Sequence, residues 1–230
     1  MKILSVLFFL LMLCGQEIVS GEQAPETPEQ VVKKVQEAYS RNCCFKAKFD
    51  QLTVNQAMDL RDRFTGIMYV KKPGSISLDV EYPELQKVVV KGKSYSIYFP
   101  EDGTAAQGEV PPEMNVEHFF GFFANIGNLD RNFSVAFPEK SMDKEDNVVF
   151  LELTDALNPR STYRIVLGID ANVFTVKRAI IYDALGNYNR FDLSAITFVD
   201  FLPDSRFEAT GTPLRVVPSS KGFFDDSEKK

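Results

Sequence analysis

The stretch Phe45-Lys46-Ala47-Lys48-Phe49-Asp50 decides the fold class, because its apolar and charged residues alternate one by one. Successive side chains of a β-strand point to opposite faces, so this alternation predicts a strand with one buried and one exposed face. The segment Ile76-Ser77-Leu78-Asp79-Val80-Glu81 repeats the pattern. Both segments therefore predict a sheet with one apolar face.

Further strands are expected on both sides of these two segments. They are expected at 64–70, 86–91, 94–99, 132–138, 147–154, 161–169, 174–182 and 187–200. Turn residues, chiefly Gly, Pro, Asn and Asp, separate them, as at 71–74 and 183–187. Because helices are not regularly interposed, the pattern predicts a mainly β protein, with an antiparallel sheet of about eleven strands that curls toward a barrel.

Two helices are expected in addition to the strands. Thr27 followed by Pro28 and by Gln30 has the pattern of an N-cap with a capping box, and apolar residues at helical spacing continue to Tyr39. A second helix is expected from Asn115 to Ile126, and phenylalanines cover much of it. That surface is more apolar than a helix resting one stripe on a filled core needs, although a buried helix that plugs the sheet would also explain it.

The N-terminal residues predict export. Lys2 precedes an apolar run from Ile3 to Leu13 that is too short to span a bilayer and is typical of a secretory signal peptide, expected at 1–20. Lipidation at Cys14 is the less favoured alternative, because the bulky Leu13 stands where such a processing site normally has a small residue.

The rest of the chain is expected to form a single domain. Its length, 21–218, suffices for one sizeable hydrophobic core. The last residues, 219–230, are polar and charged, and we expect them to be a disordered tail.

Charge and motifs argue against several function classes. The formal net charge is −6, whereas nucleic-acid binders carry basic patches. The single histidine, His118, allows no His-based metal cluster, and the chain has no Gly-x-Ser-x-Gly elbow and no Gly-x-x-x-x-Gly-Lys phosphate loop. We therefore expect a protein that is not an enzyme and has no cofactor, metal or nucleic-acid partner. We also expect a monomer.

Cys43 and Cys44 are neighbours in the sequence. A bridge between adjacent residues is unfavourable, so a disulfide scaffold is not expected. Two small, partly buried hydrophobic residues at the start of a strand are the favoured interpretation, with a redox or intermolecular role as the alternative.

Several motifs, taken in order, resemble the LolA family of periplasmic outer-membrane lipoprotein carriers over nearly all of the mature chain. They are Phe-x-x-x-Phe-x-Gln at 45–51, a glycine-started strand with a basic-Pro turn at 66–73, Tyr-Phe-Pro at 98–100, Asp-x-x-Gly-Asn at 183–187, and Leu-Pro-Asp-Ser-Arg-Phe at 202–207. None of these motifs is specific alone, but their order and spacing together are. The extended C-terminal strand of some family members is expected to be absent.

The resemblance implies an incomplete antiparallel β-barrel with helices lying across the opening as a lid. It also implies a carrier in the periplasm of a Gram-negative bacterium that binds the acyl chains of lipoproteins in a hydrophobic cavity. Such a carrier takes its cargo from an inner-membrane lipoprotein-releasing transporter and delivers it to an outer-membrane acceptor. A carrier of another lipid, such as a glycolipid or phospholipid, and a lipid-sensing regulatory module are the alternatives on the same fold.

The candidate cavity residues are the apolar side chains of the predicted inner face and of the lid. The candidates for the wall are Phe45, Phe49, Met68, Val70, Ile76, Leu78, Val80, Tyr95 and Ile97, and those for the lid are Phe119, Phe122, Phe123 and Ile126. Lys72 stands where the best-known members have an arginine that latches the lid. Lysine can make one such contact but lacks the planar fork of donors, so we expect a weaker or differently made latch.

Overall fold

A computed structural model of the chain describes residues 26–109, 123, 126, 129–139, 142, 145–156, 163–209 and the backbone of 212–216. The signal peptide expected at 1–20, the tail expected at 219–230 and most of the helix expected at 115–126 lie outside the described residues.

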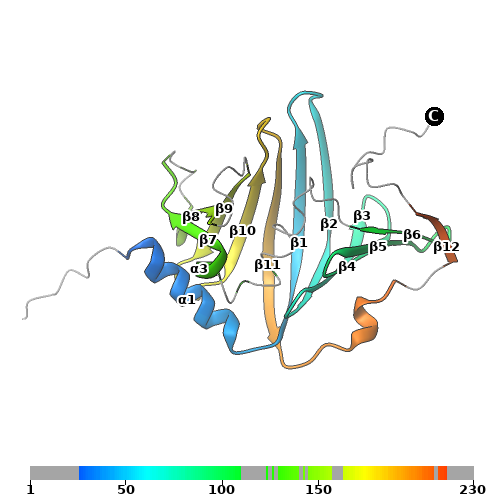
Figure 1. Ribbon diagram of the computed structural model, residues 1–230, viewed down its shortest axis with the longest axis horizontal. Helices are drawn as coiled ribbons and strands as arrows, with labels where there is room; N and C mark the ends of the chain where they lie inside the picture. The colour runs from blue at the N-terminus through cyan, green and yellow to red at the C-terminus, as the bar shows by residue number, and fades with distance from the viewer. Residues whose placement is uncertain are drawn as a thin grey trace, which may run out of the picture.

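One large sheet dominates the described part of the chain (Figure 1). Its strands are β1 (Cys44–Asn55), β2 (Leu60–Lys71), β3 (Ser75–Tyr82), β4 (Gln86–Lys91), β5 (Ser94–Phe99), β6 (Thr104–Glu109), β7 (Phe133–Ala136), β8 (Val148–Asp155), β9 (Arg164–Asp170), β10 (Val176–Tyr182), β11 (Tyr188–Val199) and β12 (Thr212–Val216). Their order across the sheet is β12-β6-β5-β4-β3-β2-β1-β11-β10-β9-β8-β7. The described strands at the two edges, β12 and β7, are not paired with each other, so the barrel stays open, as predicted.

All neighbours in the sheet pair antiparallel except β12 with β6. The fold class predicted from the alternation is therefore confirmed. Two details were wrong. A C-terminal strand is present as β12, which pairs in parallel with the edge of β6. β6 itself was not predicted, because Thr-Ala-Ala-Gln-Gly-Glu lacks the alternation of large apolar and polar residues, and Thr104 is its one β-branched residue.

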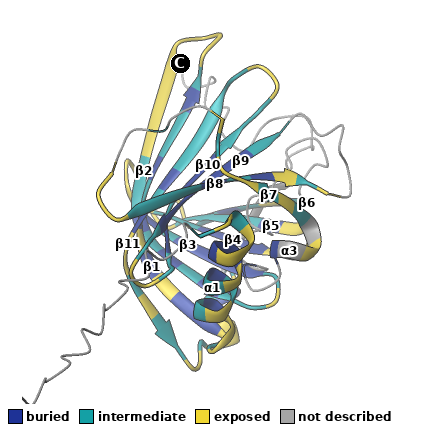
Figure 2. Ribbon diagram, turned by 90° about the vertical axis from the view of Figure 1, so that its left-hand side faces the viewer, coloured by how far each residue is buried: buried dark blue, intermediate teal, exposed yellow. Residues whose placement is uncertain are grey.

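The helix α1 (Pro28–Ser40) begins as the sequence predicts. The Thr27 backbone N–H donates to Gln30 Oε1 at 2.8 Å, and the Gln30 N–H donates to Thr27 Oγ1 at 3.3 Å, so both halves of the capping box form. The short helix α3 (Leu129–Asn132) packs beside α1. Figure 2 shows both helices lying within the curve of the sheet.

The two faces of β1 differ as predicted. Phe45, Ala47 and Phe49 are buried, whereas Lys46 and Lys48 are exposed. We call the face that carries Phe45 the inner face and the opposite one the outer face. The helices α1 and α3 lie on the inner face.

The outer face of β3 and β4 is also covered, which the alternation did not predict. Residues 200–209, here called the outer segment, follow β11 and include the 3₁₀-helix η3 (Asp204–Phe207), which contacts β3 and β4. Ser77, Val89 and Phe207 are buried as a result. Ser77 therefore has a buried position although its pattern predicted an exposed one.

Gly66 gives the sheet a place to bend between β2 and β3. A Cβ atom at Gly66 would lie 2.0 Å from the Asp79 carbonyl oxygen, so no other residue fits without moving the backbone. The register of the two strands shifts between Thr65 and Gly66. A glycine at such an irregularity lets two strands approach closely and bends the sheet.

Candidate functional site

The predicted wall residues lie together on the inner face. They belong to β1, β2, β3 and β5 and are Phe45, Phe49, Met68, Val70, Ile76, Leu78, Val80, Tyr95 and Ile97. All are buried except Ile97, which is half-buried and packs against the others. One apolar cluster joins them to α1. The structure therefore brings the predicted wall together, while its role in lipid binding stays a prediction.

The described part of the predicted lid belongs to the same cluster. Phe123 and Ile126 are both fully buried, and Leu129 of α3 lies beside them in the cluster. Phe119 and Phe122 lie outside the described residues. The described lid residues thus share the apolar cluster of the inner face, while their role as a lid stays a prediction.

Sequence reasoning missed the part of the wall that β4 contributes. Val88 and Val90 pair directly with Leu78 and Ile76 of β3, and directly paired residues share a face of the sheet. Both are buried in the cluster. The unbroken run Val88-Val89-Val90 hides the alternation. The position of this run between two alternating strands could still have shown that Val88 and Val90 belong to the wall.

The apolar face also continues beyond β1 in the other direction. Its members there, on β8 to β11, are Leu151, Leu153, Ile165, Leu167, Ile169, Val176, Ala179, Phe191 and Leu193. The inner face is therefore apolar on both sides of β1, and not only on the side predicted from β1 to β5.

The inner face of α1 is apolar as well. Its buried residues are Val31, Val32, Val35 and Tyr39, spaced so that they lie on one side of the helix. The helix was predicted to be amphipathic and to pack on another surface, which the structure confirms. Its residues were not among the predicted site residues, although they belong to the same apolar cluster as the wall.

Tyr39, in the last turn of α1, joins this helix to both halves of the sheet. Its ring packs edge-to-face against Phe45 of β1 at 5.2 Å and against Phe198 of β11 at 5.1 Å between centroids. Its hydroxyl accepts a hydrogen bond from the backbone N–H of Val176 at 3.1 Å. Burial raises the pKa of Tyr39 well above its ordinary value, so the hydroxyl keeps its proton.

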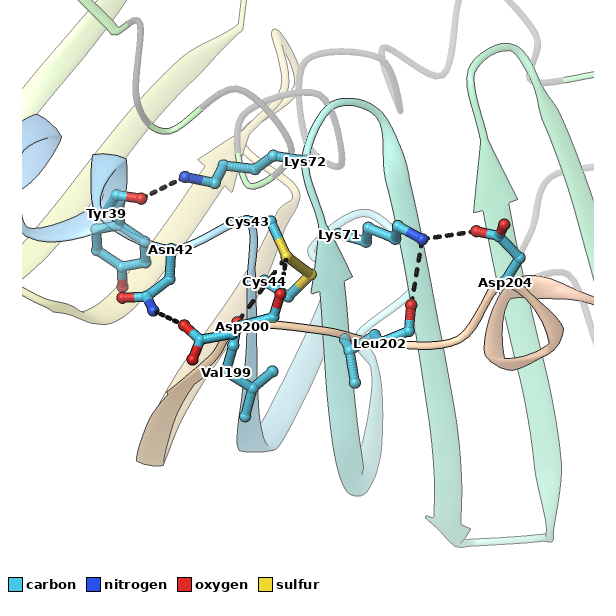
Figure 3. Close-up of a disulfide and its surroundings, with 10 residues drawn as sticks. All are labelled: Tyr39, Asn42, Cys43, Cys44, Lys71, Lys72, Val199, Asp200, Leu202 and Asp204. Carbon is cyan, nitrogen blue, oxygen red and sulfur yellow. Dashed lines mark hydrogen bonds and ion pairs between the residues drawn. A yellow bond between two sulfur atoms is a disulfide. The ribbon is translucent and has the colours of Figure 1, made fainter.

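Lys72 contacts the same residue from the β2–β3 turn. Its ammonium donates to the Tyr39 carbonyl oxygen (Figure 3). The last carbonyls of a helix lack partners within the helix and carry partial negative charge, and α1 has no basic residue in its own last turn. Lys72, in the β2–β3 turn, supplies the positive charge that the last turn of α1 lacks. Partial burial lowers the pKa of Lys72.

This geometry describes the predicted latch position in part. Lys72 contacts α1, and most of the lid residues predicted at 115–126 lie outside the described residues. We call Tyr39, Lys72 and Val176 the α1 anchor, because their two hydrogen bonds hold the C-terminal turn of α1 in place. The role of Lys72 as a latch of the lid stays a prediction.

The prediction that Cys43 and Cys44 are unbridged was wrong. They form a disulfide between adjacent residues, with their Cα atoms 3.8 Å apart. Side chains of neighbouring residues within a strand point apart, but Cys43 lies at a bend just before β1, so its side chain can meet that of Cys44. Figure 3 shows the bridge beside Asp200, whose carbonyl oxygen lies 3.1 Å from Cys43 Sγ.

The outer segment is held by ion pairs. Lys71 Nζ donates to Asp204 Oδ1 at 2.6 Å and to the Leu202 carbonyl oxygen at 3.1 Å. Arg206 pairs with Asp79 of β3 at 2.7 Å, and its guanidinium stacks over the Tyr69 ring. The hydrogen bond from Lys71 lowers the pKa of Asp204.

The described residues give no sign of a metal centre or a membrane-spanning helix. Among them, no three His, Cys, Asp or Glu side chains lie close enough together to hold a metal ion. None of the helices that the structure describes has the length and apolar composition that crossing a bilayer requires.

Comparisons with known proteins agree with the resemblance seen in the motifs. Residues 42–210 match the family model described as "Outer membrane lipoprotein carrier protein LolA". An outer-membrane lipoprotein carrier protein of Pseudomonas putida strain KT2440 is 20% identical over 197 residues, which cover 86% of this chain and 92% of that protein. A second one, from strain GB-1, is 20% identical over 196 residues, covering 85% and 91%.

Solved structures align with the chain at low sequence identity. An uncharacterized conserved protein from Thermus thermophilus aligns with a TM-score of 0.50 at 9% identity, covering 81% of this chain and 98% of that one. A LolA superfamily protein from Nitrosomonas europaea aligns with a TM-score of 0.43 at 17% identity, covering 80% and 98%.

Proposed function

The chain belongs to the LolA family of outer membrane lipoprotein carrier proteins, and on that basis we propose that it carries acylated lipoproteins through the periplasm with their acyl chains bound on the inner face. Proteins of this family are periplasmic and act in transport rather than as enzymes. The cargo would come from an inner-membrane lipoprotein-releasing transporter and pass to an outer-membrane acceptor.

The observation that carries the proposal is the continuous apolar cluster between the inner face and α1. An acyl chain needs such a surface, because each methylene exposed to water costs about 0.8 kcal/mol and a chain of about sixteen carbons costs on the order of 10 kcal/mol. The wall from β1 to β5 offers apolar side chains along the length of the acyl chain. The carrier therefore offsets most of the cost of crossing water.

Release of the cargo requires that the cover over the wall can move. In the described structure, α1 buries Val31, Val32 and Val35 in the apolar cluster of the inner face. Apolar contacts have no fixed direction, so an acyl chain can replace these side chains without leaving a buried polar group unpaired. We propose that cargo and α1 alternate on the same apolar surface.

The α1 anchor gives this exchange a pivot. Tyr39 is held by Val176 from β10 and by Lys72 from the β2–β3 turn, at the C-terminal end of the helix. The N-terminal half of α1 is seated by its valines and by Lys34, whose ammonium lies 4.6 Å from the centre of the Phe174 ring. The N-terminal half can then leave the sheet while the anchored end stays.

Native mass spectrometry of the protein purified from its own periplasm tests the proposal. We expect a monomer that retains triacylated lipoprotein. Retained glycolipid or free phospholipid would favour a carrier of another lipid, and the absence of any lipid would favour a regulatory module; each result contradicts lipoprotein transport. Lys48→Glu, on the exposed face of β1, should retain cargo as the unmodified protein does and serves as the control for wall variants.

A further inference from the structure

The Cys43–Cys44 disulfide lies at the joint between α1 and β1, where several segments of the chain meet (Figure 3). The Cys43 carbonyl oxygen accepts from the backbone N–H of Lys72 at 2.9 Å. Asn42 Nδ2 donates to Asp200 Oδ1 at 2.8 Å. The joint therefore connects the end of α1 to the β2–β3 turn and to the residues after β11.

A stabilising cross-link is a poor explanation for this bridge. Disulfides stabilise chiefly by closing a long loop in the unfolded chain, and a bridge between adjacent residues closes the shortest loop there is. It also joins no two separate elements covalently, since Asp200 and Lys72 contact the joint without being bonded to it. What the bridge does restrict is the backbone between Cys43 and Cys44.

The two cysteines differ in exposure. Cys43 is an exposed residue, whereas Cys44 is buried with 1% of its surface accessible. We therefore expect an attacking thiolate to approach the bridge at Cys43 rather than at Cys44. Exposed disulfides are the ones that typically react by thiol–disulfide exchange.

We propose that Cys43–Cys44 is a reversible thiol–disulfide exchange site for a dithiol protein, and that its redox state sets how firmly α1 is held at the sheet. A thiolate of the dithiol protein attacks Cys43 Sγ, forms a mixed disulfide and releases the Cys44 thiolate, which takes up a proton. The second thiol of the dithiol protein then loses its proton. It attacks the first sulfur of the dithiol protein, which is bonded to Cys43 in the mixed disulfide. That step releases the Cys43 thiolate, which is protonated in turn, and leaves the dithiol protein oxidised.

The position of the bridge connects this chemistry to α1. The oxidised ring limits rotation about the backbone bonds between Cys43 and Cys44, and the opened ring returns that freedom. Tyr39, the centre of the α1 anchor, is four residues before Cys43 in the sequence. Reduction therefore loosens the chain next to the anchor, while the apolar seat of α1 is unchanged.

The exchange chemistry is tested without any cargo. The oxidised protein is mixed with a thioredoxin whose resolving cysteine is replaced by alanine, and the trapped complex is digested with trypsin. The fragment of residues 42–46 carries both cysteines, and fragmentation should place the thioredoxin on Cys43 with Cys44 free. No trapped complex, attachment at Cys44, or free thiols at both positions in protein purified under oxidising conditions would each overturn the exchange site.

Hydrogen exchange of α1 tests the consequence. Amides at 28–40 should exchange about tenfold faster after reduction with dithiothreitol, which corresponds to about 1.4 kcal/mol of local opening free energy. The Cys43→Ala, Cys44→Ala double variant should exchange at the reduced rate with and without dithiothreitol. Equal protection of α1 in the oxidised and reduced protein would overturn the coupling.

Only the meaning of this switch for cargo rests on the proposed function. Lipid content, measured on the same oxidised and reduced samples, separates the two. Absence of acyl cargo in both states would contradict the carrier function and leave the exchange site standing. Acyl cargo together with an unreactive bridge would contradict the exchange site and leave the carrier function standing.

Discussion

The two covers of the sheet are held in different ways. On the inner face, α1 buries Val31, Val32 and Val35 in the apolar cluster, with hydrogen bonds at its anchored C-terminal turn. On the outer face, the outer segment buries Phe207 and is fixed by the ion pairs Lys71–Asp204 and Arg206–Asp79.

This difference indicates which cover can exchange with a lipid. Charged contacts need a particular partner, and moving the outer segment would leave Asp79 and Lys71 without theirs. Apolar contacts need only another apolar surface, which an acyl chain provides. The same sheet thus carries a fixed cover on one side and an exchangeable one on the other.

Leu78→Glu should break the inner face with the largest effect. Leu78 is only 4% exposed, so the new carboxyl would have a raised pKa and would cost about 4 kcal/mol of unfolding free energy at pH 7. That cost should shrink as the pH falls and the carboxyl is protonated. Urea unfolding measures the stability, and native mass spectrometry should find no retained acyl chains in the folded variant.

The matched control for this variant adds the same carboxyl to the outer face. Lys48→Glu should change stability by less than about 0.5 kcal/mol, because residue 48 is exposed. Undiminished lipid retention in folded Leu78→Glu protein would remove Leu78 from the wall.

Tyr39→Phe should weaken the anchor while leaving the apolar seat of α1 intact. The ring contacts remain, but the buried Val176 N–H loses its acceptor, which costs about 1–3 kcal/mol. Urea unfolding followed by circular dichroism measures the loss. Tyr98→Phe, at a half-buried position on β5, is the comparison, and an equal loss in both variants would show that the Val176 bond is unimportant.

Lys72→Ala should have a smaller effect, confined to the anchored end of α1. Loss of a partly exposed charged donor to the Tyr39 carbonyl should cost about 1 kcal/mol. Hydrogen exchange at 28–40 should rise, and Lys72→Arg should restore protection because its guanidinium also donates there. If Lys72→Ala leaves the protection of α1 unchanged, Lys72 is no latch.

Acidification should weaken the attachment of the outer segment, with the smallest effect. Because the folded pKa of Asp204 is lowered by Lys71, its ion pair stabilises the outer segment above the unfolded pKa and is lost as the pH falls through the folded value. Protection of the amides at 200–209, measured by hydrogen exchange relative to the intrinsic rate at each pH, should therefore fall toward about pH 3. In Asp204→Asn this loss of protection should be smaller, and an identical loss would exclude Asp204 as its source.

Much of the sheet was predictable from the sequence because side-chain direction in a strand is a local property. The alternation at Phe45 to Asp50 correctly predicted both faces of β1. The prediction failed where this local signal is absent, as in β6, which pairs through its backbone with β5 and carries no clear pattern. The prediction failed again at Val88 and Val90, because Val89 between them is also apolar and the alternation is lost.

The site was predictable to a lesser degree. The wall residues could be chosen because each follows from its own strand, and the structure brings them into one cluster. The partner of Lys72 could not be chosen, because it depends on where the C-terminal turn of α1 comes to lie. The same holds for the disulfide, which needs the bend at Cys43.

By itself, the sequence determined the one-sided strands, the capped first helix and the family, since all three depend on the order and spacing of nearby residues. Only the tertiary structure decided what lies over each face. The anchor joins Tyr39 to Lys72 and Val176, and the outer segment joins Arg206 to Asp79. These contacts connect residues far apart in the chain. No local pattern specifies them, because the two partners come within contact distance only when the sheet has formed.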